Sequence, residues 1–355
     1  MGTEECGGPR VTLSILVPHS TETSGTCGPL FVSLGRQTGF DRSLVELVVC
    51  DDGPHCPDIS DAVSMSNLPA RRISIPKGGP GGARNALFGA SRGRYVMFCD
   101  ADDGFCRRDG ISTMLEAAGG GPDVITSVYM REGMDGNGAK PFYKTCHVHG
   151  KAFRRGFAEE VGARFLEGVP SGEDAAFCHV LVCFANNRGT LREVAAPPFY
   201  VWRYNTESVS RSRTYGQLRE IPYWCMSVRT IALRHGPLRT GGSVGLDIAS
   251  ALYYAFVLLS FRPYVEANGE GAELYRGAVD AVAGMADGFD LSDIGKEAFR
   301  TNAKRAEDVV RMDFESSGFR FEMPHMPFLD WLDSIGVHFT ASEEARRAIG
   351  RFPLE

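Results

Sequence analysis

The sequence predicts an α/β fold, in which helices flank a mostly parallel sheet, followed by a C-terminal helical region. Two observations carry the prediction. In residues 1–214, short apolar runs typical of buried strands alternate with helical segments, which is the pattern of an α/β domain. From residue 215 to residue 355 the periodicity is helical throughout. We therefore expect two domains, 1–214 and 215–355.

The elements follow from the apolar runs and their boundaries. The expected strands are residues 11–17, ended by Pro18, then 45–50, 72–75, 95–99 and 124–130, with an extended segment at 194–204. The expected helices are 27–37, one from about Ala83, one capped by Asp109 and running to Ala118, 172–185, and then 221–235, 246–261, 269–285, 296–314 and 328–335. Because ligands of open α/β sheets bind beyond the carboxyl ends of the strands, the polar loops there should converge on one crevice.

Composition restricts the class of protein. The 355 residues are 43% hydrophobic and 23% charged, with a net charge of −6, as in an ordinary globular protein. This balance weakens a nucleic-acid-binding interpretation. The ten cysteines form no C-x-x-C pair and no zinc-site spacing, which indicates a reducing cytoplasm. The longest uncharged run, 248–261, is shorter than the ~20 residues that span a bilayer, so we expect a buried helix.

The sequence FCDADDG places three carboxylates directly after the apolar run 95–99. Side chains alternate along an extended chain, so Asp100 and Asp102 should point to the same side. Paired carboxylates of this kind suit Mg²⁺ or Mn²⁺. A solvated turn is the alternative, because acidic residues beside glycine are common in turns.

Six motifs in order resemble family 2 glycosyltransferases of the GT-A fold, which use nucleotide sugars. The motifs are SILVP at 14–18, LVVCDDG at 47–53, GGPGGARNALFGASRGRYVMFCDADD at 78–103, HGKAFRR at 149–155, GEDAAF at 172–177 and WRYNTESVSR at 202–211. The glycine-rich loop does not follow the first strand as a dinucleotide-binding G-x-G-x-x-G would, which argues against a dehydrogenase. The region after residue 215 is outside the resemblance.

The resemblance implies roles for particular residues. It places Asp51 on the uracil of a UDP-sugar, Asp100 near the ribose and Asp102, within a D-x-D motif, on the metal between the phosphates. The full set of implied nucleotide-sugar contacts is Pro18, Asp51, Arg84, Asn85, Asp100, Ala101, Arg203 and Ser208. The chain departs from the family at His19 and Pro54, so a base other than uracil is an alternative.

The second acidic pair is assigned to catalysis by the same resemblance. It makes Asp174 the general base that removes the proton of the acceptor hydroxyl, with Glu173 in support. A helix N-terminus also attracts acids for stability alone, and this is the alternative for both. His149 and Lys151 lie between the two acidic pairs in sequence and are candidates for contacts with the acceptor or the sugar.

The function expected from these motifs is inverting, Mn²⁺- or Mg²⁺-dependent transfer of a sugar from a nucleoside diphosphate sugar to a hydroxyl. The implied acceptor is a cell-surface glycan or a teichoic-acid precursor, reached from the cytoplasm or the inner face of the membrane. The helical region is expected to bind the acceptor or to form a homo-oligomer. Two alternatives remain: a phage-type transferase acting on hydroxylated bases of DNA, and a non-catalytic nucleotide-sugar-binding protein.

Overall fold

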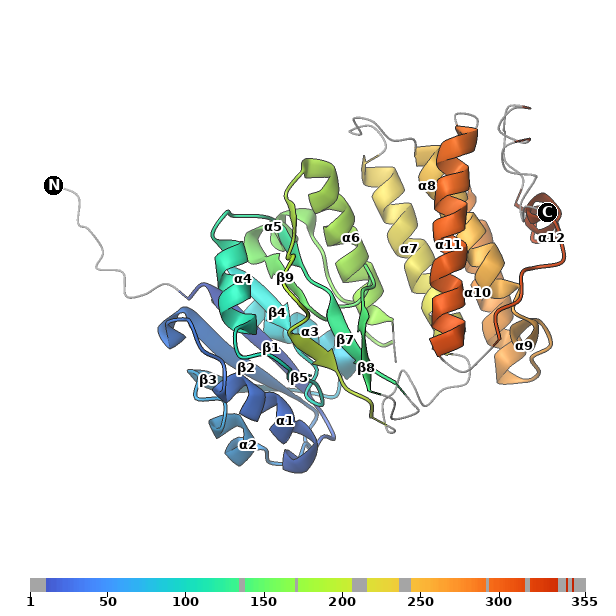
Figure 1. Cartoon of the computed structure of the whole chain (residues 1–355). Helices are drawn as coiled ribbons and strands as arrows, with labels where there is room; N and C mark the ends of the chain where they lie inside the picture. The colour runs from blue at the N-terminus through green and yellow to red at the C-terminus, as the bar shows by residue number, and fades with distance from the viewer. Residues whose placement is uncertain are drawn as a thin grey trace. The chain divides into compact units, whose positions relative to one another are not determined.

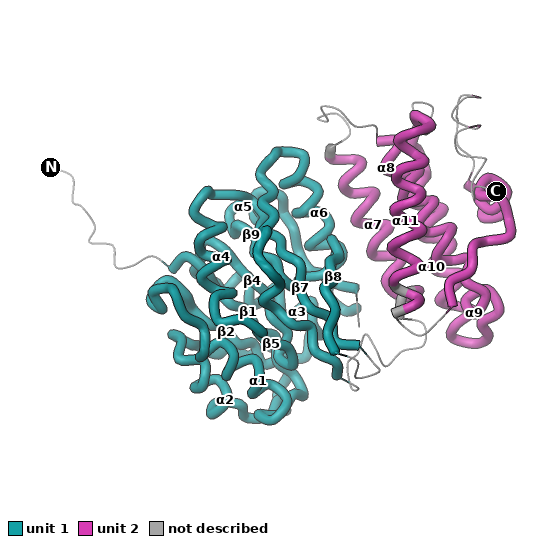
Figure 2. The backbone as a smooth tube through the Cα atoms, in the orientation of Figure 1, with its two compact units in different colours: residues 1–212 teal, residues 213–355 magenta. Residues whose placement is uncertain are grey.

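The computed structural model divides the chain into two compact units, residues 1–212 and 213–355 (Figure 2). It describes residues 11–133, 138–169, 172–205, 216–235, 244–291, 294–316 and 320–337, together with 343 and 347. Each unit is described by itself below.

The N-terminal unit is built on a seven-stranded sheet whose core is parallel (Figure 1). The strand order is β10-β6-β9-β4-β1-β2-β3. The bounds are β1 Leu13–His19, β2 Val45–Asp52, β3 Ala70–Ile75, β4 Tyr95–Phe98, β6 Val124–Thr126, β9 Lys151–Arg154 and β10 Leu191–Glu193. Strands β4, β1, β2 and β3 run parallel, and β9 is antiparallel to both of its neighbours. The predicted α/β class with a mostly parallel sheet is confirmed.

The prediction that Pro18 ends the first strand is wrong, because β1 continues through Pro18 to His19. On one side of this strand, the pairing with β4 stops at Leu16 opposite Phe98. On the other side, β2 stays paired as far as His19 opposite Asp51. A proline is tolerated where a ladder has already ended on one side. The extra residue brings His19 next to Asp51, and this pair returns below.

A second, four-stranded sheet lies beside the first and has the order β5-β11-β7-β8. Its strands are β5 Gly104–Phe105, β7 Tyr129–Glu132, β8 Ala139–Phe142 and β11 Tyr200–Trp202. The predicted strand 124–130 is therefore two strands, β6 and β7, in different sheets. The break falls at Ser127, whose hydroxyl and backbone N–H both donate to the Gly150 carbonyl. Of the predicted extended segment 194–204, three residues form β11.

Helices cover both faces of the large sheet. They are α1 Ser24–Gly35, α2 Ser60–Ser64, α3 Gly79–Ala90, α4 Gly110–Ala118, α5 Arg155–Val161 and α6 Glu173–Arg188, with a 3₁₀ turn at Arg42–Leu44. On one face, Ile15 and Val49 share a core with Phe31 of α1 and Met114 of α4. On the other face, Phe98 packs edge-on against Phe177 of α6, with ring centroids 5.8 Å apart. The alternation along each strand serves both cores.

Two predicted helix starts need correction. Helix α3 begins at Gly79, earlier than Ala83. A Cβ atom on Gly81 would lie 1.8 Å from the Leu166 carbonyl oxygen, so the glycine allows α3 to pack against the loop before α6. Asp109 precedes α4 but makes no side-chain cap, because its carboxylate pairs with Arg107.

The C-terminal unit is helical, as predicted. Its helices are α7 Gly216–His235, α8 Val244–Leu259, α9 Arg262–Val265, α10 Glu270–Ala286, α11 Lys296–Ser316 and α12 Phe328–Ser334. Helix α8, the predicted buried helix, lies in the core with Phe256 packed against Phe328 and Trp331 of α12. Among the helices that the structure describes, none combines the length and apolar character needed to cross a bilayer.

Candidate active site

The three carboxylates after β4 differ in their surroundings. Asp103 is fully buried, accepting a hydrogen bond from the Tyr200 hydroxyl (2.6 Å) and another from the Arg203 backbone N–H (3.0 Å). Asp102 accepts from the Asn205 amide at 2.8 Å. The Asp100 side chain is 27% exposed and pairs with Arg84. Asp103 therefore ties the acidic loop to β11, while Asp100 and Asp102 stay nearer the surface.

Burial and the charges of their neighbours shift the pKa values of all three carboxylates. Burial, together with the charges of Asp100 and Asp102, raises the pKa of Asp103 well above its ordinary value. Burial and Asp100 also raise the pKa of Asp102. Burial opposes ionisation of Asp100 as well, but Arg84 and then His149 outweigh it and lower its pKa. The loop thus concentrates negative charge that a cation would relieve.

Arg84 joins the two acidic pairs. It lies on α3 with its side chain 6% exposed, and its two terminal nitrogens pair with Asp100 (2.6 Å) and with Glu173 in the first turn of α6. Its guanidinium also lies over the Phe165 ring, 5.7 Å from the centroid. Arg84 is thus a buried residue of α3 and not a surface arginine. Arg84 instead brings Glu173, and with it the neighbouring Asp174, to the acidic loop.

Asn85 anchors the loop that leads to α6. Its amide nitrogen donates to the Phe165 carbonyl at 3.0 Å and to Glu167 at 2.8 Å, and its oxygen accepts the Phe165 backbone N–H at 3.0 Å. These bonds join neighbours in space that are 80 or more positions apart in sequence. In this structure Asn85 supports the loop, and a direct nucleotide contact stays a prediction.

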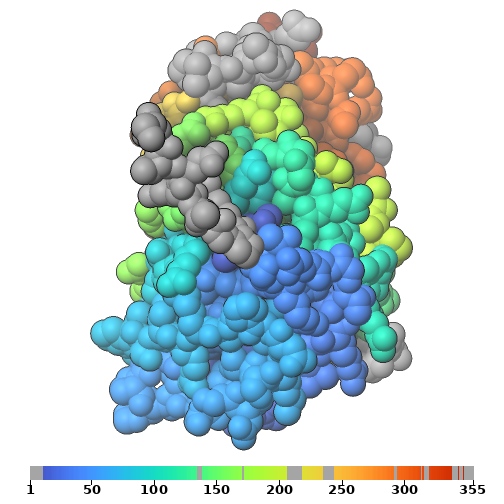
Figure 3. All heavy atoms as spheres, turned by 90° about the vertical axis from the view of Figure 1, so that its left-hand side faces the viewer, coloured from blue at the N-terminus to red at the C-terminus, as the bar shows by residue number. Residues whose placement is uncertain are grey.

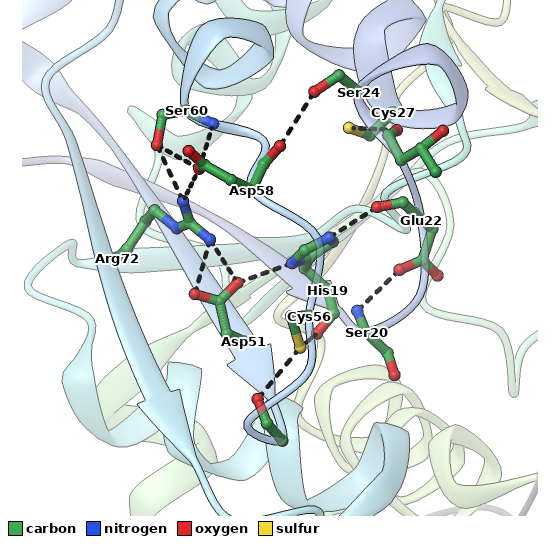
Figure 4. Close-up of polar contacts among 12 residues, drawn as sticks. His19, Ser20, Glu22, Ser24, Cys27, Asp51, Cys56, Asp58, Ser60 and Arg72 are labelled. Atoms are coloured by element: carbon green, nitrogen blue, oxygen red, sulfur yellow. Dashed lines mark hydrogen bonds and ion pairs between the residues drawn. The ribbon is translucent and has the colours of Figure 1, made fainter.

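A cavity of about 620 Å³ opens where β2 and β3 end. Its lining residues are Asp51, Gly53, Pro54, Cys56, Ser74, Ile75, Pro76 and Lys77. Asp51 is held between His19 (2.7 Å) and Arg72 (2.8 Å) (Figure 4). Asp52 accepts the backbone N–H groups of Gly78 and Gly79, which fixes the glycine-rich loop. Asp51 therefore contributes a carboxylate to the wall of the cavity, which lies beside the start of α3.

The remaining predicted residues fall in different places. His149 stacks on Tyr200 and Trp202, with its Nδ1 3.5 Å from Asp103. Lys151 is fully buried, and its ammonium donates to the carbonyls of residues 144 and 147, so it supports a turn. Pro18 lies in β1, Ala101 is buried in the acidic loop, and Arg203 is half-buried after β11. Ser208 lies outside the described residues.

The structure adds residues that sequence reasoning missed. Tyr200 and Asn205 bind the acidic loop from about 100 positions away, and His19 and Arg72 flank Asp51. His19 and Arg72 could have been predicted from the parallel register of β1, β2 and β3. This register places His19 opposite Asp51 on one side, and on the other side it places Asp51 opposite Ser74, which is two positions from Arg72.

One cluster near the acidic loop has the geometry to hold a cation. Ligand atoms of Asp100, Asp103 and His149 lie within 4.8 Å of one another, and Asp102 follows in the same loop. Oxygen ligands with one imidazole suit Mn²⁺, and carboxylates alone suit Mg²⁺. Segments far apart in the sequence, blue and green in Figure 3, border one another on one face of this unit.

Comparison with known proteins identifies the domain that carries these features. Residues 14–178 match the model of the family described as Glycosyl transferase family 2. These residues form a family 2 glycosyltransferase domain. The chain is 27% identical over 233 residues to the succinoglycan biosynthesis protein ExoO of Rhizobium meliloti, covering 57% of this chain and 63% of that protein. It is 29% identical over 126 residues to EpsH of Bacillus subtilis, covering 35% of each.

The fold of the chain is similar to that of S. aureus TarS. TarS 1-349 in complex with UDP-GlcNAc superposes with a TM-score of 0.57 at 15% identity, covering 88% of this chain and 93% of that one. The GT-A fold followed by a helical region is thereby confirmed. The chain spans less than two thirds of the length of ExoO and about a third of EpsH.

Proposed function

We propose that this chain is a metal-dependent, inverting glycosyltransferase that moves a sugar from a UDP-sugar to a hydroxyl of a glycan or teichoic-acid type acceptor. The observation that supports it most is the Arg84 bridge. This bridge sets the acidic loop after β4 against the first turn of α6. A donor-binding carboxylate pair and a candidate base are thus held together by one buried guanidinium.

Each residue of the site has a separate proposed role. Asp51 faces the cavity and receives the base of the donor, and Asp100 receives the ribose. Asp174 lies in the first turn of α6 and takes the proton of the acceptor hydroxyl, whose oxygen attacks the anomeric carbon from the face opposite the diphosphate. Glu173 is engaged by Arg84 and positions this turn. Arg203 follows β11, and its guanidinium is proposed to pair with the phosphates of the donor.

The residues of the acidic loop fit a divalent cation. Asp102 would hold it, and the same loop contributes Asp100 and Asp103, whose ligand atoms converge with His149. The raised pKa of Asp102 and Asp103 marks an excess of negative charge of the kind that a divalent cation neutralises. When bound, the cation stabilises the charge that develops on the departing diphosphate.

Donor and acceptor are inferred from the relatives. TarS was crystallised with UDP-GlcNAc, and the name of ExoO places it in succinoglycan biosynthesis. The first favours a UDP-sugar donor, and the second favours a polysaccharide as acceptor. We propose that the helical unit binds this acceptor or joins copies of the chain, and that the protein acts in the cytoplasm, peripheral to the membrane.

Thermal unfolding with nucleoside diphosphates tests this proposal. We expect UDP with Mn²⁺ to raise the melting temperature, because a ligand that binds the folded state alone stabilises it by ~2.7 kcal/mol at a hundredfold excess over its dissociation constant. Asp102→Ala should lose the contribution of Mn²⁺, while Asp61→Ala, an exposed acid on α2, should keep it. The Mn²⁺ contribution should shrink as the pH falls, since the raised pKa of Asp102 lets protons compete with the metal. A panel in which no nucleotide shifts the transition would contradict the proposal.

A further inference from the structure

Three side chains that carry metal-binding atoms meet beside the cavity at the ends of β2 and β3. His19 is the last residue of β1, Asp51 lies in β2, and Cys56 lies between β2 and α2 (Figure 4). One ligand atom from each residue lies within 4.8 Å of the other two. Asp51 and Cys56 also line the cavity, so the cluster can be reached by a ligand from that side.

The contacts of His19 are those expected of a metal-binding histidine. Its side chain is fully buried, its Nε2 lies 2.9 Å from the Glu22 carbonyl oxygen, and its Nδ1 lies 2.7 Å from Asp51 Oδ1. A histidine that binds a metal through one ring nitrogen usually donates the N–H of the other to a carboxylate or a backbone carbonyl, which fixes the ring. A hydrogen bond from Nε2 to the Glu22 carbonyl would fix this ring with Nδ1 directed at the cation.

Asp51 is oriented by Arg72. The Arg72 Nη2 group donates to both oxygens of the carboxylate, at 2.9 and 2.8 Å. Carboxylates that bind metals are themselves commonly held by hydrogen bonds from neighbouring groups. Because a carboxylate has about four lone-pair sites, Asp51 can keep both contacts with Arg72 and still coordinate a cation through Oδ1.

Cys56 supplies a sulfur ligand. Its side chain is half-buried, and its Sγ lies 3.4 Å from the Gly53 carbonyl oxygen. Burial and the charge of Asp51 raise the pKa of this thiol, so it keeps its proton until a cation binds. Binding would replace the S–H bond by a bond from sulfur to the metal and release the proton to the solvent.

We propose that His19, Asp51 and Cys56 form a binding site for a thiophilic divalent cation of the Zn²⁺ class. Sulfur, imidazole nitrogen and carboxylate oxygen are the ligands of zinc, which is often held by three protein groups with a fourth tetrahedral position open. Zinc bonds of about 2.0–2.2 Å would separate Nδ1 and Oδ1 by roughly 3.4 Å. These atoms, 2.7 Å apart, therefore need to part only slightly. The fourth position would face the cavity.

The charges around the cluster favour a cation. Among the described residues, two cationic side chains face four carboxylates there: Arg72 and Lys77 face Glu22, Asp51, Asp52 and Asp58. The surroundings of the cluster therefore keep a net negative charge. The cluster at the acidic loop differs, because it combines carboxylates with an imidazole and contains no sulfur, which suits Mn²⁺ or Mg²⁺. The two sites should thus select different cations.

A cation at this site should compete with the donor. This consequence rests on the proposed function, in which Asp51 receives the base of a nucleotide sugar. Because the cation would occupy Asp51 beside the cavity, the base could not use the same carboxylate. Zn²⁺ should therefore lower the affinity for UDP, whereas the metal site itself does not depend on the identity of the donor.

Cobalt substitution of the full-length chain tests the site. Co²⁺ replaces Zn²⁺ in sites of this kind, and a thiolate bound to it gives a sulfur-to-cobalt charge-transfer band. After treatment with a chelator and addition of Co²⁺, we expect this band in the wild type, its displacement by Zn²⁺ and its loss in Cys56→Ser. Cys106→Ser, which changes an exposed cysteine, should keep the band, and so should Asp102→Ala in the acidic loop. A band that is absent, or that survives in Cys56→Ser, would overturn the inference.

The affinity for Zn²⁺, measured by competition with a chromophoric chelator, tests the histidine ligand. Loss of a group that only supports a metal ligand typically costs 10- to 100-fold in affinity, so loss of a ligand should cost at least as much. We expect this loss in His19→Asn, whereas His55→Asn, which changes an exposed histidine of the neighbouring loop, should bind like the wild type. Thermal unfolding without metal shows that each variant is folded. Equal affinities for folded His19→Asn and the wild type would contradict the proposed ligand set.

Calorimetric titration with UDP separates this inference from the donor proposal. UDP also chelates Zn²⁺, so Cys56→Ser, for which this chelation is the same, is the reference. With Zn²⁺ at a hundredfold excess over its dissociation constant, we expect UDP to bind the wild type about 100-fold more weakly, as for two ligands that exclude each other. Cys56→Ser should lose much less. Equal losses in both proteins, or no binding of UDP at all, would contradict the role of Asp51 in binding the base, while the cobalt band still decides the metal site.

Discussion

Replacing Asp174 by asparagine is expected to slow glycosyl transfer by about 10²- to 10⁴-fold, the usual contribution of a positioned general base. Binding of UDP should stay close to that of the wild type. The reason is geometric, because Asp174 lies in the first turn of α6, while the proposed base subsite lies at the ends of β2 and β3. Initial rates and calorimetry on the same preparations would separate the two effects.

The control for this prediction is Asp61→Asn. Asp61 is likewise an acid in the first turn of a helix, but it is exposed on α2. Either substitution removes a favourable interaction with the helix dipole, worth typically 0.3–1 kcal/mol. A loss of rate common to both variants would therefore reflect helix stability, and undiminished transfer by Asp174→Asn would exclude Asp174 as the base.

Arg84→Met should destabilise the N-terminal unit by about 3–5 kcal/mol, as when one partner of a buried ion pair is removed. The substitution leaves Glu173 buried, with a side chain 7% exposed, and takes away the cation beside Asp100. Denaturant unfolding, followed by a signal from the N-terminal unit, would measure the loss. Arg92→Met, an exposed arginine just after the same helix, should unfold like the wild type.

A second substitution sharpens this test. Adding Glu173→Gln to Arg84→Met removes the buried charge that the first substitution leaves uncompensated, so the double variant should recover part of the lost stability. If Arg84→Met unfolds like Arg92→Met, or if the two losses simply add, Arg84 does not join the acidic loop to α6 in the way described.

The central strands of the sheet could be predicted because each is a continuous apolar run in the sequence. Buried parallel strands such as 45–50 read directly from composition, and the structure extends this one by only two residues, to Asp52. The prediction of a single strand at 124–130 was wrong, because the chain passes from one sheet to the other at Ser127 while the sequence stays largely apolar. The short strands β9 and β10 went unrecognised, since three or four residues carry too little periodicity.

The acidic residues of the site could be predicted from the sequence, but the contacts that join them could not. The order of the motifs pointed to Asp100, Asp102, Glu173 and Asp174. It gave no sign that Arg84 joins Asp100 to Glu173, which lies 89 positions after Arg84. Such contacts depend on tertiary packing of α3 against α6.

The most direct test of the account is release of UDP from UDP-sugars by the purified chain, with water or an added glycan as acceptor. The proposed mechanism predicts release with Mn²⁺ present, little without it, and loss in Asp102→Ala, while Asp61→Ala turns over like the wild type. Release that needs no metal, or that survives in Asp102→Ala, would contradict the assignment of the acidic loop as the site that holds the donor diphosphate.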